Sequence, residues 1–374
     1  MFNGLNLKNE ERIVFKLRSL YQKYGYAQYK MSKFEEYELY VRNKDFLVSD
    51  SIITFTDTNG KLLALKPDVT LSIVKNTADE PGCVQKVCYD ENVYRISKNT
   101  RDFREIMQTG LECIGDIDAY NKYEVITLAA NSLKAVSESY VLDLSHIGIV
   151  SAALESAGCD NSLKKDMLTC LGEKNLSGIE KLCAQGGIDG ESMERLVTLV
   201  SVYGSIEKVL PRLKSICGTA ALREAYDEFE EICNMLCSGG YSDRINIDFS
   251  IANDMKYYNG FVFRGFVEGV PEGVLSGGQY DNLMKKMHRR SGAIGFAVYL
   301  DRFERLGATG SRYDVDTLLI YDRECSADDV AAAVEKLGEG SSSVMAQKEI
   351  PQNIKYRLLA RLDGEGVKIV ENND

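Results

Sequence analysis

The chain has 374 residues, of which 44% are hydrophobic and 27% are charged, and these are ordinary values for a globular protein of two or three domains. No apolar run reaches the roughly 18–20 residues of a membrane span, and residues 1–12 lack the apolar core of a signal peptide. We therefore expect a cytoplasmic protein without a membrane span. The net charge of −11 disfavours a large tRNA interface, although local basic surfaces do occur in acidic proteins.

Ten cysteines without a secretory signal are expected to be reduced thiols. Their spacing does not fit a metal site, and the chain has only two histidines to complete one. We therefore expect neither a metal nor a cofactor, and interpret the cysteines as small apolar residues.

Residues 1–150 combine helical and strand patterns. Apolar residues at three- and four-residue spacing predict an amphipathic helix over residues 8–24, and a second helix is predicted over about 118–140. The dipeptide Asn59-Gly60 between two apolar runs predicts a hairpin. The predicted strands are residues 51–56, 61–65, 93–95 and 106–115, the last two joined by a charged loop over residues 96–105.

A long helical region interrupts this pattern. From about residue 152 to residue 240 the helical pattern continues almost without strands, notably over residues 163–171, 192–203 and 220–236. Strands are again predicted over residues 245–250, 257–267 and 293–298, and a helix over residues 299–306. We therefore predict a core domain split into residues 1–150 and 243–307, with residues 151–242 as a helical insertion.

The last part of the chain follows a predicted linker over residues 307–312. Residues 313–374 predict a small α/β unit. Its predicted strands are residues 317–321, 342–346 and 367–370, and its predicted helices are residues 327–337 and 351–362. The sequence assigns this unit no role.

The strand over residues 106–115 is the most informative for function. Side chains alternate between the two faces of a strand, so Gln108, Gly110 and Glu112 share one face. Because glycine has no side chain, it would leave room for a ligand between the two polar groups. A carboxylate and a carboxamide there could bind a ligand that carries N–H donors. A solvent-facing strand is the plain alternative for this segment taken alone.

Two further segments carry candidate ligand groups. Asp68 and Thr70 add acceptors at alternating spacing on a second extended segment. Tyr257 and Tyr258 would place one phenol on each side of a third strand, although such a pair is more often part of a core.

Together the segments resemble the catalytic domain of class II aminoacyl-tRNA synthetases, specifically the histidyl enzyme. Residues 94–112 resemble motif 2, residues 293–302 resemble motif 3, and Tyr257-Tyr258-Asn259-Gly260 with residues 276–281 resemble two histidyl-specific signatures. The resemblance spans residues 10–306 in order. It implies an α+β fold with an antiparallel sheet flanked by helices, a helical insertion and a small C-terminal α/β unit.

The resemblance also implies roles for individual residues. Asp68, Thr70 and Gln108 stand where the family holds the α-amino group of histidine, while Glu112 and Tyr258, next to Tyr257, stand where it reads the imidazole. Imidazole offers a donor and an acceptor, which a carboxylate and a phenol can pair. Three retained arginines would be a remnant of a nucleotide or anion site: Arg95, Arg104 and Arg302.

Departures from the family pattern concern the activation of histidine by ATP. Asn253 replaces an arginine four residues before the tyrosine pair, Lys256 replaces an acidic residue, and Ser97 replaces a glutamate that helps to hold adenine. Activation gathers negative charge at the α-phosphate, so the site needs positioned cations. The amino-acid half of the site is therefore expected to be intact and the ATP half damaged.

This combination resembles the regulatory subunits of ATP phosphoribosyltransferase. The resemblance implies a non-catalytic histidine sensor that forms a homodimer within a hetero-oligomer, together with the short-form catalytic subunit of histidine biosynthesis, and that mediates feedback inhibition. Two alternatives stay open: an active histidyl-tRNA synthetase with an unusual source of the arginine, and a synthetase-like domain with another role, such as tRNA binding.

Overall fold

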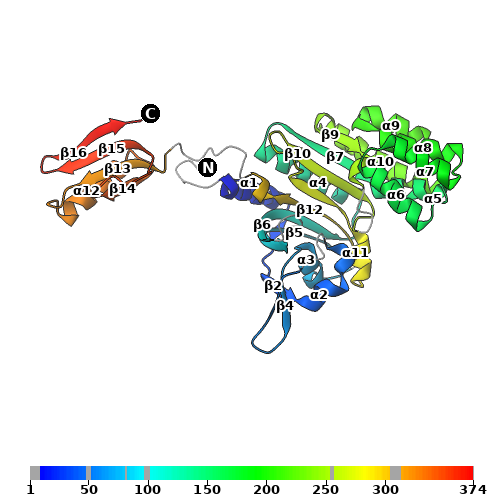
Figure 1. Cartoon of the computed structure of the whole chain (residues 1–374), viewed down its shortest axis with the longest axis horizontal. Coiled ribbons are helices and arrows are strands. Elements are labelled where there is room, and N and C mark those ends of the chain that lie inside the picture. The colour runs from blue at the N-terminus through cyan, green and yellow to red at the C-terminus, as the bar shows by residue number, and fades with distance from the viewer. Residues whose placement is uncertain are drawn as a thin grey trace. The chain divides into compact units, whose positions relative to one another are not determined.

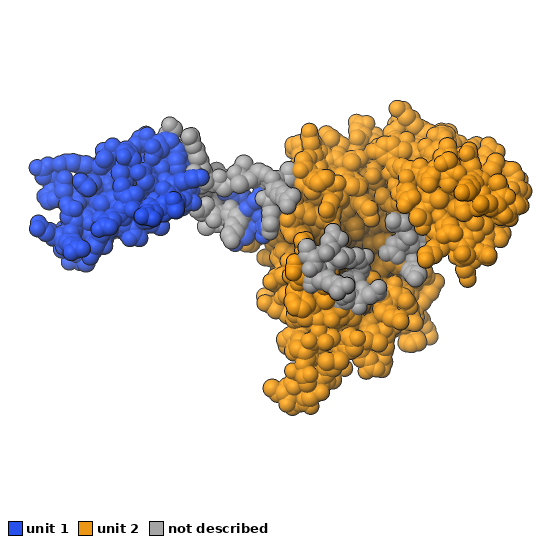
Figure 2. Space-filling model, viewed as in Figure 1, with its two compact units in different colours: residues 1–12, 304–374 blue, residues 13–303 orange. Residues whose placement is uncertain are grey.

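The computed structural model describes residues 9–47, 52–80, 82–96, 102–252, 257–303 and 313–373. The chain divides into two compact units, residues 13–303 and residues 304–374 with residues 1–12 (Figure 2). None of the described helices has the length and apolarity needed to cross a membrane.

A nine-stranded sheet forms the centre of the larger unit (Figure 1). The strands from β5 to β7 in the sheet pair antiparallel, while β1 and β9 are added in parallel to β5 and β7. In spatial order the strands are β1 (Ala27–Gln28), β5 (Val84–Ile96), β6 (Phe103–Gly115), β12 (Gly292–Tyr299), β11 (Leu275–Gln279), β10 (Phe261–Val267), β7 (Tyr140–His146), β9 (Ile245–Asp248) and β8 (Tyr203–Ser205). This architecture confirms the predicted α+β fold.

The paired strands β5 and β6 are longer than predicted. They pair continuously from Val84 opposite Gly115 to Ile96 opposite Phe103. The predicted charged loop over residues 96–105 is therefore too long, because residues 103–105 already belong to β6. This continuous pairing with β5 fixes the register of β6, and with it the face of the sheet on which each β6 side chain lies.

Helices α1 (Asn9–Lys23) and α4 (Ala119–Val136) pack together on the sheet. The hydroxyl groups of Tyr21 in α1 and Ser132 in α4 lie 3.0 Å apart, and the Tyr21 ring contacts Phe296 of β12 edge to face. Asp118 caps α4 by accepting from the backbone N–H of Asn121, whose side chain accepts from the Asp118 N–H. The two predicted helices are confirmed by these elements.

A second, three-stranded sheet lies in the N-terminal part of the larger unit. Its order is β2-β4-β3, and β3 and β4 form the predicted hairpin around Asn59-Gly60. The strands and the helices beside them are β2 (Phe34–Glu36), β3 (Thr54–Thr56), β4 (Leu62–Leu65), α2 (Tyr37–Arg42) and α3 (Thr70–Asn76).

Residues 147–238 are mostly helical. The helices are α5 (Ile147–Ser156), α6 (Asn161–Gly172), α7 (Leu176–Gly186), α8 (Gly190–Ser201), α9 (Ile206–Ser215) and α10 (Ala220–Ser238). Four begin at side-chain caps that accept from the backbone of the first turn, namely Asp160, Asn175, Asp189 and Thr219. The short strand β8 joins the region to the large sheet through β9. The division into a split core domain and an insertion stays a prediction.

The smaller unit contains a four-stranded sheet of order β14-β13-β15-β16 and one described helix. Its elements are β13 (Val315–Tyr321), α12 (Ala327–Gly338), β14 (Val344–Gln347), β15 (Tyr356–Asp363) and β16 (Gly366–Asn372). The predicted helix over residues 351–362 is wrong, because these residues lead into β15, which pairs in parallel with β13. Leu359 packs in one apolar cluster and Ala360 with Leu362 in another, as expected for side chains on opposite faces of a strand.

Candidate functional site

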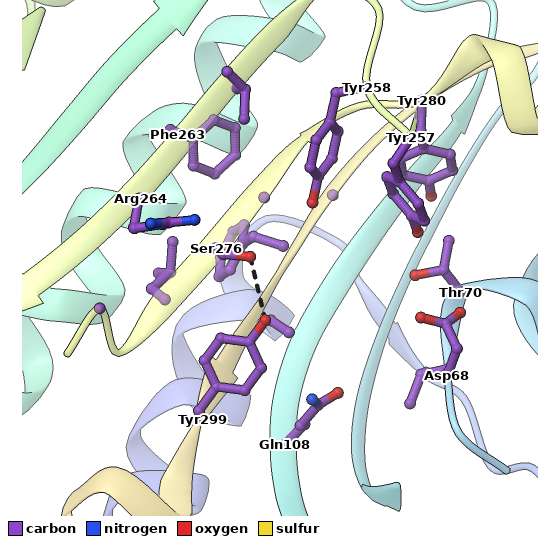
Figure 3. A pocket seen from close by; sticks show the side chains of 18 of the residues that line it. Asp68, Thr70, Gln108, Tyr257, Tyr258, Phe263, Arg264, Ser276, Tyr280 and Tyr299 are labelled. Carbon is purple, nitrogen blue, oxygen red and sulfur yellow. Dashed lines mark hydrogen bonds between the residues drawn. The ribbon is translucent and has the colours of Figure 1, made fainter. Parts of the chain in front are cut away.

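A cavity of about 570 Å³ lies over the large sheet, between the loops that enter α3 and β10. It is lined by Asp68, Thr70, Gln108, Glu112, Tyr257 and Tyr258, so the structure brings together all six residues that the sequence suggests for histidine. Figure 3 labels these residues except Glu112. Two of the three suggested arginines, Arg95 and Arg302, also line it.

The floor of the cavity is formed by β6. Gln108 and Glu112 are only 3% and 2% exposed, and both side chains leave the same face of the strand. The neighbouring strand β12 places Gly295 directly opposite Glu112. A Cβ atom at Gly295 would overlap the Glu112 carboxyl group, so glycine is required there for that group to lie across the strand.

Gly110 does not leave room for a ligand on the face of β6, contrary to the prediction. Tyr89 of β5 stands opposite Gly110, and its phenol covers the glycine so closely that a Cβ atom at Gly110 would lie 2.6 Å from the Tyr89 oxygen. Tyr89 is buried and lines the cavity. The glycine therefore accommodates an aromatic ring from the next strand, which sequence periodicity within β6 could not indicate.

Asp68 and Thr70 lie at a helix start and not on an extended strand, which corrects the predicted local structure. Thr70 is the first residue of α3. The Asp68 side chain accepts a hydrogen bond from the backbone N–H of Leu71 at 2.9 Å. Burial raises the pKa of Asp68, and that hydrogen bond and the nearby Arg95 oppose the shift. Both residues reach the cavity because the chain turns into α3 beside it.

Two hydroxyl groups hold the carboxyl group of Glu112. Thr70 Oγ1 donates to one oxygen at 2.7 Å and the Tyr280 phenol donates to the other at 2.5 Å. Burial raises the pKa of Glu112 to about 8, and the two hydrogen bonds lower it only in part. Tyr280 was not among the suggested ligands, although it stands in the 276–281 signature, and only its position across the cavity reveals its role.

Tyr257 and Tyr258 both precede β10, which begins at Phe261, so the predicted strand over residues 257–267 starts too early. Their rings do not lie on opposite faces of a strand, but contact each other with centroids 4.7 Å apart. Tyr257 is buried, and burial together with the charge of Asp68 raises its pKa well above the usual value. The phenol of Tyr258 points into the cavity (Figure 3).

Two arginine side chains of the cavity lining are held by backbone carbonyl groups. Arg95 donates through Nε to the Pro67 carbonyl at 3.0 Å. Arg302 donates to the Gly273 carbonyl and lies over the ring of Tyr299, 4.8 Å from its centroid. Arg302 follows β12 in a short 3-10 helix, Leu300–Phe303, where a longer helix over residues 299–306 was predicted; residues 304–306 lie outside the described residues.

Arg104 and Arg264 differ from the expectation in opposite ways. Arg104 stands opposite Arg95 in the β5–β6 ladder, but it is exposed and does not line the cavity. Arg264 of β10 does line it, although the sequence did not suggest it. Three other positions used in the sequence argument, Ser97, Asn253 and Lys256, lie outside the described residues.

The lining therefore combines carboxyl groups with guanidinium groups. Asp68 and Glu112 can accept from N–H donors, and Arg95, Arg264 and Arg302 can hold a negative group. Such a set suits a small ligand that carries both kinds of group. Within the described ranges, no three His, Cys, Asp or Glu side chains are grouped to hold a metal ion.

Comparison with known proteins gives one consistent result. The family described as histidyl-tRNA synthetase matches residues 5–303. A protein of Ruminiclostridium cellulolyticum named ATP phosphoribosyltransferase regulatory subunit is 27% identical over 96% of this chain and 88% of its own length. One of that name from Thermoanaerobacter is 30% identical over 79% of this chain and 78% of its own length.

A solved structure agrees with these relatives. The protein from Bacillus halodurans described as an ATP phosphoribosyltransferase regulatory subunit/histidyl-tRNA synthetase superimposes with a TM-score of 0.75 at 25% identity, over 91% of this chain and 88% of that one. The chain therefore belongs to the histidyl-tRNA synthetase family and, within it, to the ATP phosphoribosyltransferase regulatory subunits.

Proposed function

We propose that the cavity over β6 binds histidine, and that the bound amino acid inhibits a phosphoribosyltransferase catalytic subunit with which this chain assembles. The observation that carries the proposal is the buried carboxyl group of Glu112, which Thr70 and Tyr280 hold in place. It supplies an acceptor that cannot turn away to solvent.

Histidine is the ligand that this arrangement fits best. One imidazole N–H donates to Glu112, and the Tyr258 phenol pairs with the other ring nitrogen. Asp68 and Gln108 receive the α-amino group, while an arginine of the lining takes the carboxylate. An analogue that lacks either ring nitrogen would leave a buried polar group unpaired, so the site discriminates against it.

The sequence supports loss of the activation step. In the resemblance, Asn253 stands where the histidyl enzymes carry an arginine, and Ser97 stands where they hold adenine through a glutamate. Loss of one group that stabilises transition-state charge typically costs on the order of 10²–10³ in rate. The chain then binds the amino acid without activating it.

The names of the relatives support the partner. They are called regulatory subunits of ATP phosphoribosyltransferase, so we infer a homodimer of this chain in a hetero-oligomer with the short-form catalytic subunit. Feedback requires histidine to bind the inhibited state more tightly than the active state, typically by about 1–3 kcal/mol.

Calorimetric titration with histidine tests the site. The Glu112→Ala variant is expected to lose binding at millimolar histidine and to make the assembled enzyme insensitive to histidine, without unfolding. Glu105→Ala is the matched control, because Glu105 is exposed on the same strand and should leave binding unchanged. Absence of histidine binding by the wild-type chain, or full histidine sensitivity with Glu112→Ala, would contradict the proposal.

An active histidyl-tRNA synthetase is the second candidate. Arg95 and Arg302 line the same cavity and favour it, because they could hold a nucleotide phosphate. Histidine-dependent exchange between ATP and pyrophosphate separates the two functions. We expect no exchange above background, and exchange at the rate of an active synthetase would establish the alternative.

A further inference from the structure

A short basic segment stands out on the surface of this acidic chain. Residues 285–290 contain four Lys or Arg residues and one His, although the net charge of the chain is −11. They cover the end of α11 (Asp281–Lys286) and the turn before β12. Four of these residues are exposed and together form what we call the basic surface: Lys285, Lys286, His288 and Arg290.

The side chains of the basic surface form no ion pairs within the described part of the chain. None of the four makes an ion pair or a side-chain hydrogen bond there. By contrast, nearby Arg42, Lys61 and Lys75 are paired with Glu38, Glu36 and Glu35 at 2.6–2.7 Å. The basic surface therefore presents cations that are not ion-paired among the described residues, whereas these neighbouring cations are paired.

Hydrogen bonds to α3 and to Asp79 hold the turn that carries this surface. Arg289 donates to the carbonyl groups of Val74 and Lys75 at the end of α3, at 3.3 Å and 3.2 Å. The Asp79 carboxylate accepts from the backbone N–H groups of Arg290 and Ser291 at 2.9 Å and 3.0 Å. His288 adopts a left-handed φ of 60°, where glycine is usual after a helix, so the turn is held despite a local cost.

The basic surface borders a surface cavity of about 580 Å³, lined in part by Lys286, His288, Leu39 and Met287. The carboxylates Glu36 and Glu38 also line it, but both are already paired with cations. The cavity lining therefore mixes apolar side chains, ion-paired side chains and cations that form no ion pair within the described ranges. Such a lining suits a protein surface as the ligand, whereas a free phosphate or a nucleic acid would favour a uniformly basic lining.

Two short helices connect this surface with the site around Glu112. α3 begins at Thr70 and α11 follows Tyr280, and these two residues hold the Glu112 carboxyl group. The far ends of both helices meet through Arg289. Each helix is only about 10 Å long, so the two helices form a short physical connection between Glu112 and the basic surface.

We propose that the basic surface binds an acidic protein surface. Given the proposed function, on which this identification rests, that partner is the phosphoribosyltransferase catalytic subunit, and α3 and α11 connect its docking site with the histidine site. Unpaired surface charges act mainly on the rate of association and its salt dependence.

The test uses a full-length variant in which Lys285, Lys286 and Arg290 are all replaced by Ser. Binding to the catalytic subunit is measured by biolayer interferometry at about 50 mM and about 300 mM salt. We expect affinity at the lower salt to fall by about tenfold or more, mostly through slower association, and the salt dependence to flatten. Histidine titration of the free variant should match the wild type.

A control removes the same charge elsewhere, with Lys165, Lys181 and Lys208 replaced by Ser on the helices of residues 147–238. Equal loss in both variants, or unchanged binding in the basic-surface variant, would overturn the inference. So would a variant that loses only binding to a short RNA, because the partner would then be a nucleic acid. A wild-type chain that binds neither histidine nor the catalytic subunit would instead refute the proposed function.

Discussion

Glu112 lies in surroundings that favour its protonated form. Burial raises its pKa to about 8, and the nearby charge of Asp68 adds to the shift. The unfolded chain releases this proton near the ordinary pKa of 4.5. The free energy of unfolding therefore falls as the pH rises from about 4.5 to about 8, because only the unfolded chain has lost the proton in that range.

We predict that Glu112→Gln stabilises the chain relative to the wild type at high pH. Glutamine resembles the protonated side chain and does not ionise, so the difference in unfolding free energy should grow by about 2–4 kcal/mol between pH 5.5 and pH 9. Urea denaturation at several pH values measures it. Gln108→Ala, which removes no titrating group, should shift the profile by a constant, and a parallel profile for Glu112→Gln would contradict the prediction.

At the same scale, the sequence suggested eight of the residues that line the cavity, but not how they are held. Gln108 and Glu112 follow from strand alternation, and Asp68, Thr70 and Tyr258 from the family resemblance. Tyr89 reaches the cavity because β5 pairs with β6. Tyr280 reaches it because it follows β11, which is connected to β6 through β12. Contacts between distant segments leave no periodic signal along the chain.

At the scale of elements, α10 is attached to the large sheet by a charged contact. The Glu228 carboxylate lies 2.5 Å from Lys122 Nζ and 3.4 Å from Nε2 of His146, the last residue of β7. These two partners, His146 above all, lower the pKa of Glu228 to about 2. The contact therefore stabilises the folded chain at pH values above the ordinary pKa of 4.5, and this contribution is lost as the pH falls toward 2.

We predict that Glu228→Gln lowers the free energy of unfolding at pH 7 by about 1 kcal/mol, a modest value because the carboxylate keeps part of its contact with water. The difference from the wild type should shrink at pH 3.5. Urea denaturation at both pH values checks this. Glu231→Gln, exposed on the same helix, should change stability at pH 7 by less than about 0.5 kcal/mol. A deficit that grows on acidification would be inconsistent with the contact.

Helices were predicted correctly where a helical repeat of apolar residues continues over many residues. The prediction failed where pairing between strands decides the secondary structure. α1 and α4 have sustained helical periods and formed as predicted. Residues 356–363 contain Leu, Ala and Arg, which favour helices, yet they form β15 because β13 offers a parallel partner and apolar contacts on both faces.

At the scale of the whole molecule, the candidate site belongs to one compact unit. Every cavity residue lies in residues 13–303, while β13 to β16 and α12 have apolar clusters of their own. The site therefore depends on contacts within the larger unit.

We predict that deleting residues 313–374 leaves the affinity for histidine within about twofold of the full-length value, because no cavity residue is removed. Calorimetry on the truncated chain measures the affinity, and circular dichroism checks its helical content. A tenfold or larger loss in a folded truncated chain would show that the smaller unit contributes to the site.

The sequence by itself determined the order of the motifs and, through the family resemblance that they carry, the class of fold and the residue types of the candidate site, because residue identity and motif spacing are local properties of the chain. Tertiary structure decided which groups meet. It placed Thr70 and Tyr280 on the two oxygens of Glu112, covered Gly110 with Tyr89 and left Arg104 outside the cavity. These outcomes depend on strand register and on where α3 and β10 begin, and both are fixed by packing between segments far apart in the chain.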